Sequence, residues 1–140
     1  MLLDQPMAPR RVLVVEDHDD GREALRLLLT LFGHHVEVAR DGVEGVEAAL
    51  RLRPEVALID LNMPRLDGYE VARRLRAAFG AEVVLVACTA YDHAEARRKV
   101  AEAGFDAHLV KPLNLDDLAY WLRPGVPRRR AAAGGKSPSS

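Results

Sequence analysis

The segment EVALIDLNMP, residues 55–64, places four apolar residues directly before an acid and ends in Asn-Met-Pro. The run VALI (56–59) is continuous rather than alternating, which is typical of a parallel strand covered by helices on both faces. Asp60, at the end of this strand, is then expected at the carboxyl edge of the sheet, where open α/β folds bind their ligands. The segment therefore predicts a buried strand that carries a candidate functional acid.

Similar short apolar runs recur along the chain, at VLVV (12–15), HVEVA (35–39), VVLVA (83–87) and HLV (108–110). Stretches of helical periodicity lie between them, and the clearest has Leu25, Leu28, Leu29 and Phe32 on one face. Regular strand-helix alternation with short loops predicts a parallel sheet with right-handed crossovers. We expect a doubly wound (βα)5 α/β fold with a five-stranded parallel sheet, which is flavodoxin-like if the strand order is 2-1-3-4-5.

A cap-forming residue precedes each predicted helix, three positions before an acid. The first side chain can accept from free backbone N–H groups, and the acid adds negative charge in the first turn. The five pairs are Asp20/Glu23, Asp41/Glu44, Asp67/Glu70, Asp92/Glu95 and Asn114/Asp117.

Composition favours one soluble globular domain, because 49% of the 140 residues are apolar and 29% are charged. We expect an N-terminal extension over 1–10, the domain over 11–122 and a disordered basic tail over 123–140. The whole chain carries a net charge of −1, and because 123–140 holds five bases and no acid, residues 1–122 carry −6. An acidic body argues against direct nucleic-acid binding by the domain.

The chain has one cysteine, Cys88, and no apolar run long enough to cross a bilayer. Its first residues lack the apolar region of a signal peptide, so we expect none there. We therefore expect a cytoplasmic protein that does not bind membranes.

Polar residues end or follow four of the predicted strands: Glu16, Asp17, Asp60, Thr89 and Lys111, the last followed by Pro112. In the expected strand order these residues share one edge of the sheet. Crowded carboxylates repel one another unless a cation neutralises them, and oxygen ligands favour Mg²⁺, with Mn²⁺ as a second candidate. A lysine and a hydroxyl can hold an anion, and an Asp can itself attack phosphorus to form an acyl phosphate. The group predicts a site for a phosphoryl group.

The sequence resembles the receiver domains of two-component response regulators, of the chemotaxis-regulator type, over about residues 11–122. The motifs that carry the resemblance are VLVVEDHDD, LIDLNMPRLDGYEVARRLR, CTA and GFDAHLVKPL, in that order. It implies that Asp60 accepts phosphate from a phosphohistidine on a histidine kinase or a histidine phosphotransfer protein. It also implies a Mg²⁺ site made by Asp17, Asp60, the backbone carbonyl of Asn62 and, through water, Glu16.

The resemblance assigns further roles at the same edge. Lys111 matches the phosphate-binding lysine and Thr89 the switch hydroxyl. Pro112 matches a proline that follows a cis peptide bond, and Pro64 and Gly68 shape the loop after Asp60.

Two positions bear on how such a switch would behave. His108 stands where the family commonly has Tyr or Phe, so it is either a switch residue or a partly exposed structural histidine. The segment GFDAHLVKP is similar to receivers attached to hybrid histidine kinases. Tyr91 could cover the phosphoryl group, and we expect it to make self-dephosphorylation slow.

The resemblance implies that the surface formed by the helix after Asp92, strand 108–110 and the helix after Asn114 meets an output partner. The last helix has no base before Arg123, which favours a monomer or a weak dimer. We interpret His18, His34, His35 and His93 as surface or loop residues outside any metal site.

We expect a signalling switch that performs no catalytic turnover. One alternative is the receiver of a hybrid histidine kinase, which relays phosphate to a phosphotransfer domain. Another is a phosphatase resembling the haloacid-dehalogenase family, which needs a second Asp where this chain has Asn62. A third is a degenerate receiver that acts only as an interaction module.

Overall fold

The computed structural model describes residues 8–63, 65–90 and 92–124. Five parallel strands form one sheet: β1 (Arg11–Val15), β2 (His35–Ala39), β3 (Val56–Asp60), β4 (Val84–Thr89) and β5 (Ala107–Val110). Their order, β2-β1-β3-β4-β5, confirms the predicted fold class and topology. The helices are α1 (Asp19–Leu31), α2 (Gly42–Leu52), α3 (Gly68–Phe79), α4 (Ala94–Glu102) and α5 (Leu115–Leu122), with a 3-10 turn, η2 (Gly80–Glu82), after α3.

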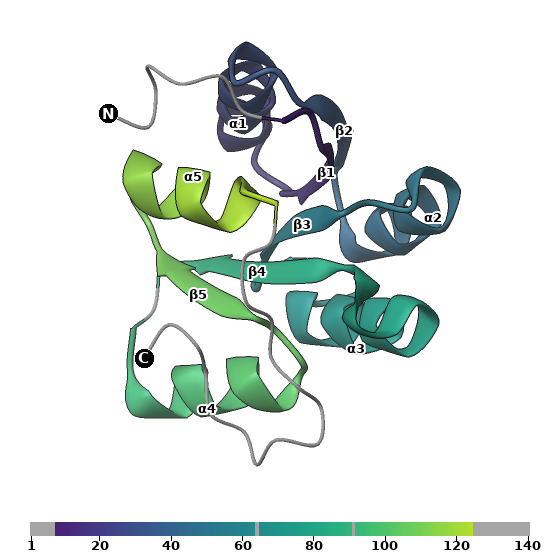
Figure 1. Cartoon of the computed structure of the whole chain (residues 1–140). Helices are drawn as coiled ribbons and strands as arrows, with labels where there is room; N and C mark the ends of the chain where they lie inside the picture. Colours follow the sequence, from purple (N-terminus) through teal and green to yellow (C-terminus); the bar gives the residue numbers. More distant parts are fainter. Residues whose placement is uncertain (1–7, 64, 91, 125–140) are drawn as a thin grey trace.

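Helices cover both faces of the sheet (Figure 1). Because successive strand residues point to opposite faces, Ile59 packs in one apolar cluster with Leu75 of α3 and Val100 of α4. Leu58 packs in the other with Leu29 of α1 and with side chains of α5. Every residue of β3 and β4 is buried, which explains why their apolar runs are continuous.

Three of the five predicted helix caps are confirmed, those of Asp41, Asp67 and Asn114. The predicted caps Asp20 and Asp92 are wrong. After β1 the chain enters α1 almost at once, so Asp20 lies in the first turn, and His18 occupies the cap position without a side-chain cap bond. Before α4, the cap is His93, whose Nδ1 accepts from Ala96 N in the place of a carboxylate oxygen.

Arg10, in the predicted N-terminal extension, packs against the domain. Its backbone N–H donates to His34 Nδ1, and its guanidinium donates to the carbonyl oxygen of Leu122. His34 lies in a loop, as expected, but it is buried.

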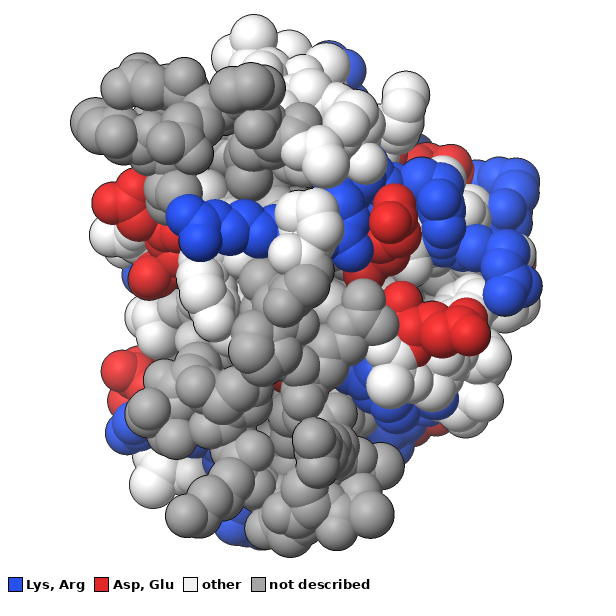
Figure 2. Space-filling view, viewed as in Figure 1, with Lys and Arg blue, Asp and Glu red and all other residues white. Residues whose placement is uncertain are grey.

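Acidic and basic side chains lie among one another on the face seen in Figure 2. Pairs within helices contribute to this mixture, for example Glu70 of α3, which accepts from both Arg73 and Arg74. No helix in the described ranges has the length and apolar character needed to cross a membrane.

Candidate functional site

The candidate residues come together at the carboxyl edge of the sheet, as the strand order predicts. Asp60 is the last residue of β3 and Thr89 the last of β4, while Glu16 directly follows β1 and Lys111 follows β5. Pairing fixes their relative heights, because Asp60 lies opposite Cys88 and Thr89 lies opposite Val110. The backbone N–H of Lys111 also donates to the carbonyl oxygen of Thr89 at 2.7 Å.

Lys111 connects the two most buried acids of the site. Its Nζ lies 2.8 Å from Glu16 Oε1 and 4.0 Å from Asp60 Oδ1. Glu16 and Asp60 are only 3% and 6% exposed, whereas the lysine side chain keeps about a third of its surface in solvent. Lys111 is thus placed to contact both the buried acids and an anion that arrives from solvent.

The acids affect one another's ionisation. Burial and the charge of Glu16 raise the pKa of Asp60 to about 7, against the smaller opposing effect of Lys111. Burial also acts to raise the pKa of Glu16, but hydrogen bonds from Lys111 and His18 outweigh it and leave that pKa lowered. Burial acts to lower the pKa of Lys111, and its bond to Glu16 outweighs this and raises it. Without a divalent cation, Asp60 is therefore only partly ionised near neutral pH.

The donor set fits a divalent metal ion. Oxygen atoms of Glu16, Asp17 and Asp60, together with a ring nitrogen of His18, lie within 4.8 Å of one another. Asp17 Oδ1 is buried and has no hydrogen bond within the described part of the chain. A buried carboxylate oxygen without a donor, among other carboxylates, is a suitable ligand for a hard cation such as Mg²⁺.

Comparison with known proteins agrees with this geometry. The protein-family model described as the response regulator receiver domain matches residues 12–123. The chain belongs to that family. Receiver domains act in two-component signal transduction, generally as non-enzymatic modules, and bind Mg²⁺ at an acidic pocket.

Curated relatives include the response regulator MprA of Mycobacterium sp. (strain KMS), 39% identical over 131 residues, covering 94% of this chain and 56% of the relative. MprA of Mycobacterium leprae is 42% identical over 113 residues, with 81% and 49% covered. This chain thus spans about half the length of the curated relatives it matches.

Solved structures show the same fold. Chemotaxis protein CheY4 of Vibrio cholerae superposes with a TM-score of 0.73 at 29% identity, over 79% of this chain and 93% of CheY4. The receiver domain of Saccharomyces cerevisiae Ssk1, crystallised with the histidine phosphotransfer protein Ypd1, gives 0.78 at 26% identity, over 84% and 89%.

The structure also bears on the other residues to which the resemblance gave a role in this receiver domain. The Lys111–Pro112 peptide bond is cis, as the resemblance implied. The backbone N–H of Asn62 lies 3.3 Å from Asp60 Oδ1 and donates to it, and the role of the Asn62 carbonyl as a ligand stays a prediction. His108 is half-buried on β5, and its switch role also stays a prediction. Pro64 and Tyr91 lie outside the described residues.

The interpretation of His18 needs correction. Its side chain is exposed, as expected, but Nδ1 lies 3.2 Å from Glu16 Oε2 and 3.4 Å from Asp17 Oδ1, so it belongs to the acidic cluster of this receiver domain. The signal in the sequence was its position, immediately after Glu16 and Asp17 and before a helix that starts at once.

Gly68 is expected to be intolerant of a side chain, because a Cβ there would lie 2.4 Å from the carbonyl oxygen of Asp60 and 2.8 Å from Leu61 Cα. Both are backbone atoms that cannot rotate away. We expect Gly68→Ala to lower the free energy of unfolding by roughly 1–3 kcal/mol, the usual cost of overpacking, as measured by urea denaturation.

Gly21 in α1 provides the matched control, because the nearest atom to its added Cβ is 3.7 Å away. Gly21→Ala should leave stability unchanged or raise it by up to about 1 kcal/mol. Equal effects of the two substitutions would contradict the proposed close approach at Gly68.

Proposed function

We propose that this receiver domain accepts a phosphoryl group on Asp60 from a phosphohistidine of a histidine kinase or a histidine phosphotransfer protein. One observation carries the proposal: a buried aspartate ends the central strand, with a lysine on one side and two further acids close by. The combination supplies a nucleophile, a cation for the incoming anion and ligands for a metal.

In the transfer, an oxygen of the Asp60 carboxylate attacks phosphorus, and the bond between phosphorus and the donor's imidazole nitrogen breaks. The electrons of that bond stay with the imidazole, which takes up a proton. Lys111 Nζ, 4.0 Å from Asp60 Oδ1, is placed to bind a phosphoryl oxygen. A Mg²⁺ ion held by Glu16, Asp17 and Asp60 would supply positive charge for the carboxylates and for the transferring group.

Attack requires the ionised form of Asp60, whereas burial and Glu16 raise its pKa to about 7. A nearby divalent charge favours the ionised carboxylate. This accounts for why phosphorylation of Asp60 would depend on metal.

The phosphoryl group would add a charge of about −1.5 to −2 at Asp60, whose strand partner Cys88 directly precedes Thr89. Thr89 ends β4, next to β5, so movement of its side chain can affect the surface of α4, β5 and α5. That surface includes the exposed apolar side chains of Val110, Leu115 and Tyr120. We propose that it meets the output partner, with His108 as the β5 residue at the switch position.

Two kinds of protein could exchange the phosphoryl group with Asp60. The likeness to the Ssk1 receiver, which was crystallised with a phosphotransfer protein, supports a histidine phosphotransfer protein. The relay from a hybrid histidine kinase uses the same chemistry in the reverse direction. Tyr91 would slow self-dephosphorylation in either pathway.

The test is exposure of the chain to acetyl phosphate with Mg²⁺, followed by mass spectrometry. We expect a mass increase of one phosphate, mapped to the peptide that contains Asp60, and its loss when a chelator is added. No modification by acetyl phosphate or by a phosphohistidine donor would indicate a phosphate-independent interaction module. Sustained turnover of a simple phosphate ester would indicate a phosphatase.

A further inference from the structure

His18 occupies a cap position without acting as a cap. It precedes α1, yet its side chain makes no hydrogen bond to the free N–H groups of that helix. His93 has the same position before α4, and there Nδ1 accepts from Ala96 N at 3.1 Å. The comparison shows that a histidine in this chain can cap a helix, as His93 does for α4. The imidazole of His18 makes no such bond to α1.

Those atoms are the carboxylates of the metal site. His18 Nδ1 lies 3.2 Å from Glu16 Oε2 and 3.4 Å from Asp17 Oδ1. Metal bonds to imidazole nitrogen and carboxylate oxygen are about 2.0–2.2 Å long, so ligand atoms at right angles around one ion are about 3 Å apart. The observed spacings suit neighbouring ligands; Nδ1 is already the hydrogen-bond partner of Glu16 Oε2, and coordination of an ion would replace that hydrogen bond.

The backbone of this loop is held in place. Arg22 of α1 donates from Nη1 to the carbonyl oxygen of Glu16 at 3.1 Å and to that of Asp17 at 3.5 Å. The His18 backbone N–H donates to Glu16 Oε2 at 3.2 Å. His18 could therefore become a metal ligand by rotation of its side chain alone, with the backbone unchanged.

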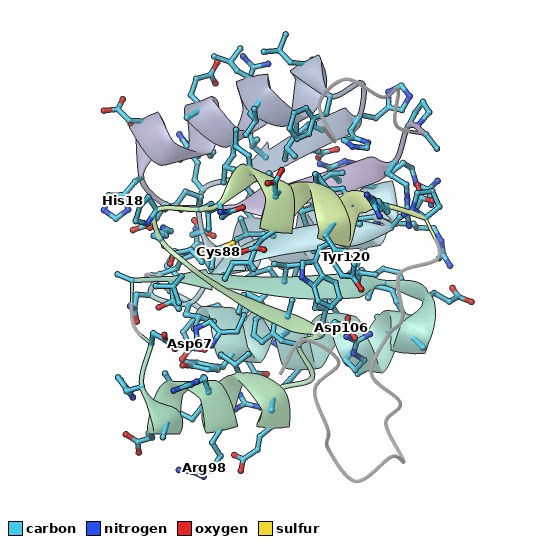
Figure 3. The ribbon with its side chains drawn as sticks, turned by 60° about the vertical axis from the view of Figure 1, so that its left-hand side comes forward. His18, Asp67, Cys88, Arg98, Asp106 and Tyr120 are labelled. Carbon is cyan, nitrogen blue, oxygen red and sulfur yellow. The ribbon has the colours of Figure 1, made fainter. Side chains whose placement is uncertain are left out.

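His18 also lies on the solvent side of the cluster. Its side chain is 77% exposed, while that of Glu16 is 4% exposed, and Figure 3 shows it at the periphery of the fold. It can take a coordination position that water would otherwise fill, without displacing the buried carboxylates or Lys111.

We infer that His18 is a nitrogen ligand of this metal site, and that the site prefers Mn²⁺ or another first-row transition-metal ion to Mg²⁺. The inference rests on the proposed function, because it concerns the metal of the same site. Imidazole suits transition metals, whereas all-oxygen sites suit Mg²⁺. One nitrogen among three carboxylates shifts the choice of ion without removing the hard ligands.

A different role for His18 predicts the opposite result. Contact with Glu16 and Asp17 raises the pKa of His18, so an imidazolium at this place could simply occupy the position of the metal. Removing such a competing cation would strengthen the binding of every divalent ion. Removing a ligand weakens the binding of transition metals most.

The experiment compares wild type, His18→Gln and a control, His35→Gln, which alters an exposed histidine at the start of β2. Pulsed EPR of bound Mn²⁺ reports directly on coordinated nitrogen. We expect ¹⁴N modulation in wild type and in His35→Gln, and none in His18→Gln. Outer-shell partners of metal ligands are worth roughly 10- to 100-fold in affinity, so loss of His18 should weaken Mn²⁺ binding at least about tenfold, with little change for Mg²⁺.

The outcomes separate this inference from the proposed function. Mn²⁺ bound without ¹⁴N modulation, or stronger binding of both ions by His18→Gln, overturns the ligand role while leaving phosphorylation intact. Nitrogen coordination in a chain that takes no phosphate supports the ligand role and contradicts the proposed function. Failure of wild type to bind either ion overturns both.

Discussion

The Asp60→Asn protein is expected to take up no phosphate and yet to be more stable than wild type near pH 7.5 when no divalent metal is present. An amide cannot act as the nucleophile, so the loss of phosphorylation should be complete. The gain in stability follows from burial, because Asp60 is 6% exposed and lies beside Glu16, and an amide carries no charge to desolvate. The raised pKa corresponds to about 1.4 kcal/mol for each pKa unit in favour of the variant, whereas Lys111 loses a charged partner, which acts against it. We therefore expect the free energy of unfolding to rise by roughly 1–3 kcal/mol.

The pH dependence has a defined sign. Asp60 has a pKa of about 7 in the folded chain and an ordinary value of 3.8. Between about pH 4 and pH 7 the folded chain keeps a proton that the unfolded chain has lost, so Asp60 lowers stability progressively as pH rises through this window. The difference in free energy of unfolding between Asp60→Asn and wild type should be small at pH 4 and largest above about pH 7.

Urea denaturation at several pH values, with and without Mg²⁺, measures these effects. Mg²⁺ should stabilise wild type, since a ligand of the folded state raises stability, and so reduce the stability difference between Asp60→Asn and wild type. Asp116→Asn, an exposed position in the first turn of α5, is the control and should keep both phosphorylation and stability. A less stable Asp60→Asn protein at pH 7.5 would show that the carboxylate is well accommodated without metal.

Replacing Arg76 by alanine is expected to lower the free energy of unfolding by about 3 kcal/mol, the lower end of the usual cost of removing one partner of a buried ion pair, because Asp106 is buried but Arg76 is only partly so. Arg76 Nη2 lies 2.8 Å from Asp106 Oδ2, and the Asp106 side chain is 1% exposed. The same guanidinium donates to the carbonyl oxygens of Gly80, Val83 and Gly104. The substitution removes the cation that faces a buried carboxylate and leaves three carbonyls to find other donors.

Arg73→Ala is the matched control, because Arg73 is on the same helix and its side chain is 55% exposed in a pair with Glu70. An exposed pair of this kind contributes at most about 1 kcal/mol. The double variant Arg76→Ala/Asp106→Asn should lose less stability than the two single variants together, since each single variant leaves one charge unpaired and the double variant leaves none. Equal losses of stability for Arg76→Ala and Arg73→Ala would show that the Arg76–Asp106 pair adds no more to stability than an exposed pair.

Much of the receiver fold could be predicted from residue patterns. Continuous apolar runs identified the strands, since a parallel strand covered on both faces has no polar side. Once the strands were known, Asp60, Thr89 and Lys111 had to share one edge, because parallel strands end together. The helix starts were less predictable: His18 and His93 took cap positions that the acids Asp20 and Asp92 were expected to hold.

Sequence by itself thus determined the fold class and the edge at which Glu16, Asp60 and Lys111 lie, because these depend on periodicity and chain connectivity. The strand order followed from the resemblance to receiver domains and is seen directly in the sheet. Only the tertiary structure decided which side chains meet there. It placed Lys111 Nζ closer to Glu16 than to Asp60, and turned His18 towards the acids. Such contacts depend on strand register, loop path and rotamer, and residues 95 positions apart, such as Glu16 and Lys111, carry no local pattern that encodes them.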